Sequence, residues 1–180
     1  MQREAQLLGL KSSFRKESYE ETKQKIQEIF WTGKYFRETP QTLYVTGDAN
    51  VFPFWFGLFT DKEMKKKVCA MMQENQLDRP FPLKYTSFIP NQFSSFLSFF
   101  AKNYEGTSIW MHLGLCYLDV VADVDEKRLN HYLLQYTNLI EKYGTFLEVF
   151  DEVGNPYRTP FYMSDEGMLW CCKFLILKKV

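Results

Sequence analysis

The feature that most constrains the fold is an alternation between two kinds of helical segment along the chain. Amphipathic segments carry apolar residues on one side, and each is followed by a segment that is apolar nearly all round. In chain order these segments are 19–31, 47–59, 61–76, 107–121, 125–143 and 167–177. A one-sided helix lies at a surface, whereas a helix that is apolar all round is buried on every side. The pattern therefore predicts three hairpins, each pairing an outer helix with an inner one.

Inner helices surrounded by outer helices are the plan of an α/α toroid, so we predict an all-α fold of this kind. The chain contains no low-complexity tract and no long linker, which indicates one domain spanning residues 1–180. A short helix is predicted near 91–103, and turn residues indicate a β-hairpin-like loop near 145–160. In a toroid the inner-helix N-termini gather at one end, so we expect a cleft lined by aromatic and polar side chains there.

Composition excludes several classes of protein. The chain carries 22 Lys and Arg against 22 Asp and Glu, and this zero net charge argues against a nucleic-acid binder. With 46% hydrophobic residues and 24% charged residues, the chain is expected to fold rather than remain disordered. Aromatic residues make up 18% of the chain, which predicts a large core or a cleft lined by rings.

The four cysteines, Cys69, Cys116, Cys171 and Cys172, lie in apolar helical segments and form no C-x-x-C pair. With only two histidines in the chain, we predict no metal site, and we expect buried free thiols in a reducing compartment. The polar start of the chain predicts no signal peptide, and no apolar stretch is long enough to span a membrane. These features predict a cytoplasmic protein without cofactor, nucleic-acid partner or membrane partner.

Four short segments lie at the starts of the predicted inner helices or in the loop before the last of them. They read GDAN at 47–50, TSIWMH at 107–112, FLEVFD at 146–151 followed by GNP at 154–156, and SDEGMLW at 164–170. Their order and spacing resemble the catalytic domain of the six-hairpin glycosidases, which include glucoamylases, trehalases and glycogen-debranching glucosidases. The resemblance covers most of residues 18–177 and is to the second half of that domain.

This resemblance implies half of an (α/α)6 barrel and a glycoside hydrolase, or a fragment of one, acting on α-linked glucose-type oligosaccharides. It implies a glutamate general base at Glu148, whereas the general acid belongs to the half of the domain that this chain does not match. Glycoside hydrolysis usually needs both carboxyl groups, one protonating the leaving oxygen and one activating water. Self-association or a second polypeptide is therefore expected to complete the toroid.

Each candidate site residue also has a purely structural interpretation. Glu148 is either the base or a solvent-facing residue of an alternating strand, and Asp48 and Asn50 either bind sugar hydroxyls or cap a helix. Trp31 and Trp110 either stack on sugar rings or pack in the core, and a satisfied core position is the alternative for His112. Within the resemblance, the predicted sugar-binding residues are Trp31, Asp48, Asn50, Trp110, His112 and Tyr143.

Two other functions stay open from the sequence. The missing general acid favours a non-catalytic helical module that binds carbohydrate or protein, the product of a truncated or split gene. A sugar epimerase or isomerase of similar toroidal plan would use His112 as an acid or base, together with a second ionisable group that the sequence does not identify. Sugar binding without turnover would indicate the first of these, and hydrogen exchange at a sugar carbon the second.

Overall fold

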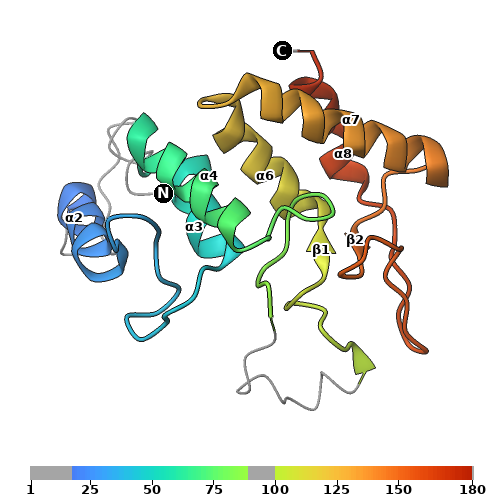
Figure 1. Cartoon of the computed structure of the whole chain (residues 1–180), viewed down its shortest axis with the longest axis horizontal. Coiled ribbons are helices and arrows are strands. Elements are labelled where there is room, and N and C mark those ends of the chain that lie inside the picture. The colour runs from blue at the N-terminus through green and yellow to red at the C-terminus, as the bar shows by residue number, and fades with distance from the viewer. Residues whose placement is uncertain (1–17, 89–99, 180) are drawn as a thin grey trace.

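The structure is a computed structural model that describes residues 18–88 and 100–179, and its described part is mostly helical (Figure 1). The helices are α2 (Tyr19–Phe30), α3 (Gly47–Trp55), α4 (Lys62–Glu74), α6 (Met111–Ala122), α7 (Glu126–Tyr143) and α8 (Met168–Leu177). Two short strands, β1 (Ile109–Trp110) and β2 (Val149–Phe150), form an antiparallel sheet. Each helical segment predicted from the periodicity overlaps one of these helices. Residues 107–110, predicted to be helical, instead precede α6 and include β1, and α3 ends at Trp55 rather than near residue 59. The short helix predicted near 91–103 lies largely outside the described residues.

Local capping explains where several helices begin and end. Ser18 and Glu21 form the predicted capping box at the start of α2, and the Asp61 side chain accepts a hydrogen bond from the Met64 amide at the start of α4. Gly144 ends α7 in the left-handed conformation, with φ of 72°. The prediction that Asp48 or Asn50 caps α3 was wrong, because the helix already begins at Gly47 with Thr46 as its N-cap.

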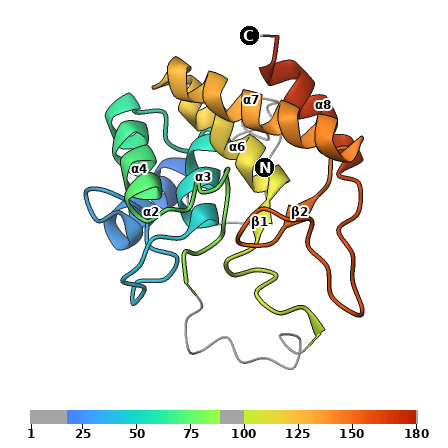
Figure 2. The ribbon, with the colours of Figure 1, turned by 45° about the vertical axis from the view of Figure 1, so that its right-hand side comes forward.

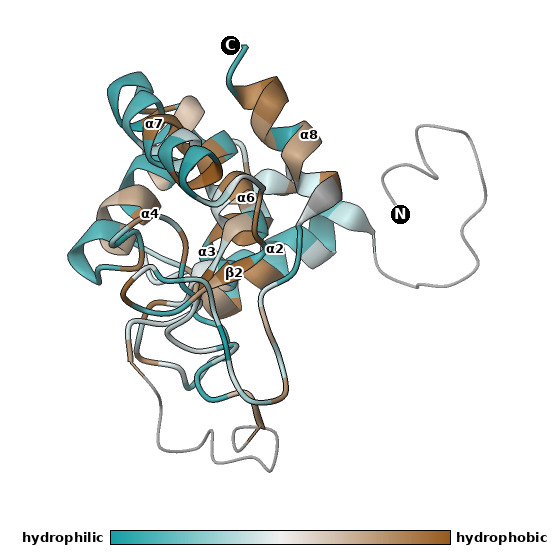
Figure 3. Cartoon of the chain, turned by 90° about the vertical axis from the view of Figure 1, so that its right-hand side faces the viewer, coloured by the Kyte–Doolittle hydropathy of each residue, from teal (hydrophilic) through white to brown (hydrophobic). Residues whose placement is uncertain are grey.

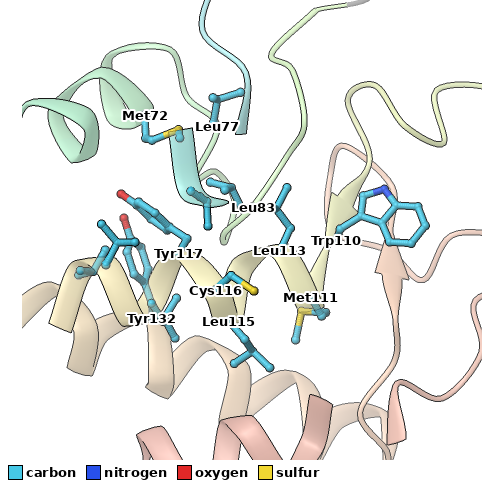
Figure 4. Close-up of a cluster of buried hydrophobic side chains, with 14 of the residues drawn as sticks. Met72, Leu77, Leu83, Trp110, Met111, Leu113, Leu115, Cys116, Tyr117 and Tyr132 are labelled. Carbon is cyan, nitrogen blue, oxygen red and sulfur yellow. The ribbon is translucent and has the colours of Figure 1, made fainter. Parts of the chain in front are cut away.

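Helix α6 is the centre of the molecule. It packs against α3 on one side and α8 on the other, and α4 and α7 also contact it. Nine of its twelve residues are buried, which confirms the burial predicted from its apolar sequence. Figure 4 shows its side chains meeting Met72 from α4, Leu83 from the following loop and Tyr132 from α7. This contact surface is the main hydrophobic core.

The prediction that the last helix is buried all round was wrong. Among the described side chains of α8 only Phe174 and Leu177 are buried, whereas Leu169, Leu175 and Ile176 are 85%, 50% and 59% exposed. Figure 3 shows α8 at the edge of the molecule, largely brown with apolar residues. The helix packs on α6 along one face, and no described segment covers the opposite face to the same degree.

The burial of the four cysteines also differs between α8 and the rest of the core. Cys69 and Cys116 are buried and free, as predicted, and burial raises the pKa of Cys69 to about 11 and that of Cys116 to about 12. The prediction of burial was wrong for the two cysteines of α8, because Cys171 is half-buried and Cys172 is exposed.

Short backbone links join the N-terminal ends of α3, α6 and α8. The Gly47 amide donates to the Tyr85 carbonyl over 2.8 Å, and the neighbouring Lys84 pairs with Ile109 of β1. Ile109 also pairs with Phe150 of β2, and Leu147 pairs with Glu166 just before α8. The starts of the three helices therefore lie at the same end of the molecule, as predicted (Figure 2).

The loop predicted as hairpin-like near 145–160 is more extended in its pairing than expected. Its first part, β2, pairs with β1 and also within the loop, where Phe150 pairs with Pro156 and the Tyr157 amide donates to the Val149 carbonyl over 3.1 Å. This pairing confirms the predicted hairpin-like loop, and a second hairpin follows it, closed by pairing between Arg158 and Met163. No helix among the described residues is long and apolar enough to cross a membrane.

Candidate functional site

Glu148 is fixed by its backbone at the junction between α6 and α8. Its amide donates to the Asp165 carbonyl over 2.8 Å, and its carbonyl accepts from the Met111 amide over 3.0 Å. The side chain is half-buried rather than fully solvent-facing. The Tyr162 hydroxyl donates a hydrogen bond of 3.2 Å to Glu148 Oε2. The carboxylate is thus held by a neutral donor at the end where the three helices begin.

The hairpin after β2 positions Tyr162. The Ser164 amide donates to the Tyr157 carbonyl, and the Ser164 hydroxyl accepts from the Val149 amide, so the hairpin is tied to β2. Phe161 and Met163 are exposed and Tyr162 between them is half-buried. Because side chains alternate along extended backbone, this pattern directs Tyr162 inward to Glu148.

Aromatic rings surround this pair. The Tyr104 ring lies 5.1 Å from that of Tyr162 and 4.6 Å from that of Trp110, measured between ring centroids. The Trp110 indole donates to the Tyr104 carbonyl over 2.7 Å, and Trp110 is buried. Burial is the main cause that raises the pKa of both Tyr104 and Tyr162, so both hydroxyls stay protonated at neutral pH.

His112 lies in the first turn of α6, beside the same rings. Its centroid is 5.1 Å from Trp110 and 5.5 Å from Trp170 of α8. Burial lowers the pKa of His112, and the negative charge of Glu148 opposes this effect. The cluster therefore contains a carboxylate and an imidazole that interact electrostatically, together with two tyrosine hydroxyls.

The structure thus brings together three of the predicted site residues, Glu148, Trp110 and His112. It adds Tyr104 and Tyr162, which sequence reasoning missed. Both tyrosines lie in irregular segments without a recognisable motif. Pairing between β1, β2 and the hairpin, which are distant in the sequence, brings them near Glu148, so no local pattern could identify them.

The side chains of two other predicted site residues, Asn50 and Tyr143, make structural contacts away from Glu148. Asn50 is fully buried, where its side-chain oxygen accepts from the Phe36 amide and its nitrogen donates to the Phe36 and Thr46 carbonyls. Its amide therefore holds the preceding loop against α3 and has no group left for a ligand. Tyr143 packs against Phe150 at 5.9 Å, with the Lys142 ammonium 4.8 Å from its ring.

Trp31 and Asp48 line two separate surface pockets. Trp31 borders a pocket of about 410 Å³ between α2 and the start of α4, together with Phe59. Asp48 borders an apolar pocket of about 360 Å³ with Glu38 and residues of α3. Burial raises the pKa of Glu38, and the charge of Asp48 adds to this effect. The two pockets share no lining residue with the cluster around Glu148.

Within the described residues, no group of three or more His, Cys, Asp or Glu side chains could hold a metal ion. A scan against protein-family models and a search of curated proteins both gave no match. The chemistry available in the cluster is proton transfer and the stacking of flat apolar surfaces on aromatic rings.

Proposed function

We propose that the chain is part of a glycoside hydrolase that acts on α-linked glucose-type oligosaccharides. Glu148 would be the general base that activates water, with Trp110 and His112 contacting the sugar. The observation that supports this role best is the position of the Glu148 carboxylate, which accepts from Tyr162 within a half-buried aromatic cluster. Partial exclusion of water by aromatic rings strengthens the electrostatic interactions of a carboxylate.

The role of Glu148 follows from the chemistry of glycoside hydrolysis. A base that activates water must stand on the face of the sugar opposite the leaving group, about 6.5–9.5 Å from the acid. We assign no general acid in this chain, so the proposal requires that a second half of the site supplies it. Tyr162 keeps its proton and can orient the carboxylate without competing for the proton taken from water.

The arrangement that we propose for the whole fold is half of an (α/α)6 toroid. Helices α3, α6 and α8 would be its inner helices and α2, α4 and α7 its outer ones. The central place of α6 between α3 and α8, and the packing of α4 and α7 on α6, support this plan. The exposed Leu169 and Ile176 of α8 support completion by self-association or by a second polypeptide. The buried free thiols Cys69 and Cys116 are compatible with the cytoplasm.

The base can be tested without the missing acid. In α-glucosyl fluoride the leaving group departs as fluoride and needs little protonation, so a site that holds only a base can hydrolyse it. We expect fluoride release by the wild-type chain and a loss of at least about 100-fold with Glu148→Gln, as is typical for general bases. Glu141→Gln, which changes an exposed carboxylate on α7, is the control and is expected to keep full activity.

Release of fluoride at the same rate by wild type and Glu148→Gln would refute the role of Glu148. Binding of maltose without any fluoride release would instead indicate the non-catalytic carbohydrate-binding module.

A sugar epimerase or isomerase is the second candidate, favoured by one observation. Such an enzyme needs two ionisable groups, and burial lowers the pKa of His112 while the charge of Glu148 opposes this effect, as expected for two neighbouring ionisable groups. Deuterium exchange from solvent into a sugar C–H position, lost with His112→Gln, would support this candidate. Exchange that persists in His112→Gln would exclude His112 from the role.

A further inference from the structure

A surface pocket of about 360 Å³ lies beside α3, apart from the candidate site. Its walls come from α2, from α3 and from the segment that follows α3, and they are mostly apolar. The apolar residues that line it are Ile26, Ala49, Phe52, Pro53, Phe56 and Leu58. Pockets that bind small molecules usually measure about 300–1,000 Å³ and have mostly apolar walls. The pocket is therefore large enough for a small organic molecule with an apolar body.

The two other residues that line the pocket, Glu38 and Asp48, both carry a carboxyl group. Burial raises the pKa of Glu38 and the charge of Asp48 adds to this effect, so the two carboxyl groups lie near each other. The ion pairs among the described residues include neither of them. Within the described part of the chain, the pocket thus combines two negative charges with no basic partner.

A structural role accounts for Asp48 but not for Glu38. Asp48 lies in the first turn of α3, where a negative charge stabilises the helix dipole, and its Oδ1 accepts from the Ala49 amide over 2.8 Å. Glu38 lies in the irregular segment between α2 and α3 and is exposed. Because like charges repel, holding Glu38 near Asp48 raises the free energy of the folded chain when both are ionised. A bound cation would remove this repulsion.

We propose that the pocket binds a small organic amine, with its ammonium group at Glu38 and Asp48 and its apolar body against Phe52 and Phe56. The centroids of these two rings lie 5.6 Å apart, and Phe56 is 70% exposed, so a ligand can reach it. Aromatic rings also attract a nearby ammonium group. This inference does not rest on the proposed function, because the pocket shares no lining residue with the cluster around Glu148.

An amine matches the pocket better than two simpler ligands do. A divalent metal ion would use the two carboxylates but none of the apolar walls, and it usually takes six or more oxygen ligands. A neutral apolar molecule would contact the walls but leave the repulsion between Glu38 and Asp48 in place. A molecule that joins an ammonium group to an apolar body satisfies both parts of the pocket.

An NMR titration of the isotope-labelled chain with tryptamine tests the proposal, and tryptophol, which has a hydroxyl group in place of the ammonium, is the neutral probe. We expect tryptamine to bind at least about five-fold more tightly than tryptophol and to shift the amide signals of Ala49 and Phe56. Glu38→Gln should weaken tryptamine binding about five-fold, as expected for a partly exposed ion pair, and change tryptophol binding less than two-fold. Glu141→Gln, which removes an exposed carboxylate on α7, should change neither affinity.

Phe56→Ala separates the contribution of the apolar wall from that of the charges. It removes an exposed ring that contacts the apolar body, so it should weaken tryptamine and tryptophol alike. The amide spectrum of each variant shows whether its fold is kept.

Three results would overturn the proposal. They are no binding of tryptamine at millimolar concentration, equal affinities of the wild-type chain for both probes, and a tryptamine affinity unchanged in Glu38→Gln. Shifts confined to the amides around Trp31 and Phe59 would place the amine in the other pocket and would also contradict it. None of these results bears on Glu148, whose role is tested separately with α-glucosyl fluoride.

Discussion

His112 responds to two opposing effects, its own burial and the charge of Glu148. Burial dominates and lowers the pKa of His112, so the folded chain binds fewer protons at this residue than the unfolded chain near its ordinary pKa of about 6.5. The resulting stability is present at neutral pH and is lost as the pH falls through the lowered pKa. The pKa of His112 therefore depends on the charge of Glu148 even when no substrate is bound.

We predict that Glu148→Gln lowers the pKa of His112 further, because the carboxylate that opposes the burial effect is removed. Proton NMR of the two histidine rings against pH measures this, and His131→Gln identifies which signal belongs to His112. An unchanged or higher pKa of His112 in Glu148→Gln would show that the two side chains do not share a site.

Tyr162→Phe is expected to lower the kcat for α-glucosyl fluoride about 10-fold with KM unchanged within about two-fold. The variant removes the hydroxyl that donates to Glu148, and one hydrogen bond to a charged group is worth about 1.5–3 kcal/mol. Tyr157→Phe is the matched control, since Tyr157 lies in the same hairpin but donates to the Lys102 carbonyl. Equal losses in both variants would indicate that the hairpin matters only for folding.

At the scale of the elements, local sequence predicted where the helices lie but predicted only part of the site around Glu148. Periodicity and caps such as Asp61 and Asp125 act within a few residues, so the local sequence contains them. Tyr162 reaches Glu148 only because β2 pairs with β1 and the hairpin folds back on β2, contacts that no local pattern encodes. For α8, hydropathy predicted burial, but it does not encode whether another described segment packs on the face that bears Leu169 and Ile176.

Helix α6 approaches the loop before it closely at Gly114, and Gly114→Ala is expected to destabilise the chain by about 2–3 kcal/mol. A Cβ atom there would lie 2.7 Å from the Pro82 carbonyl oxygen, which accepts a hydrogen bond from the Tyr136 hydroxyl. Urea unfolding measures the change, which opposes the gain of about 1 kcal/mol that alanine normally gives in a helix. Gly106→Ala, which meets no atom closer than 3.6 Å, should change stability by less than about 0.5 kcal/mol. Equal effects of both variants would contradict the close approach.

At the scale of the whole molecule, the proposed half toroid explains why no segment within residues 18–88 and 100–179 covers the apolar surface of α8 that bears Leu169 and Ile176. Leu169 and Ile176 lie on one face of the helix, seven residues apart, and both are mostly exposed. Burying such side chains contributes about 1.5–3 kcal/mol each, so their exposure favours association with another chain.

We predict that the wild-type chain self-associates as its concentration rises, and that the double variant Leu169→Lys, Ile176→Lys does not. Sedimentation velocity over a concentration series measures the association, and circular dichroism checks that the variant keeps its helices. A wild-type chain that stays monomeric at every concentration would leave completion by a second polypeptide as the surviving form of the proposal.

The most direct test of the central claim is an NMR time course of α-glucosyl fluoride with the wild-type chain and Glu148→Gln. A base that activates water inverts the anomeric carbon, so β-glucose should form first and only with the wild-type chain. Hydrolysis at the background rate by the wild-type chain, or an equal rate with Glu148→Gln, would contradict the account.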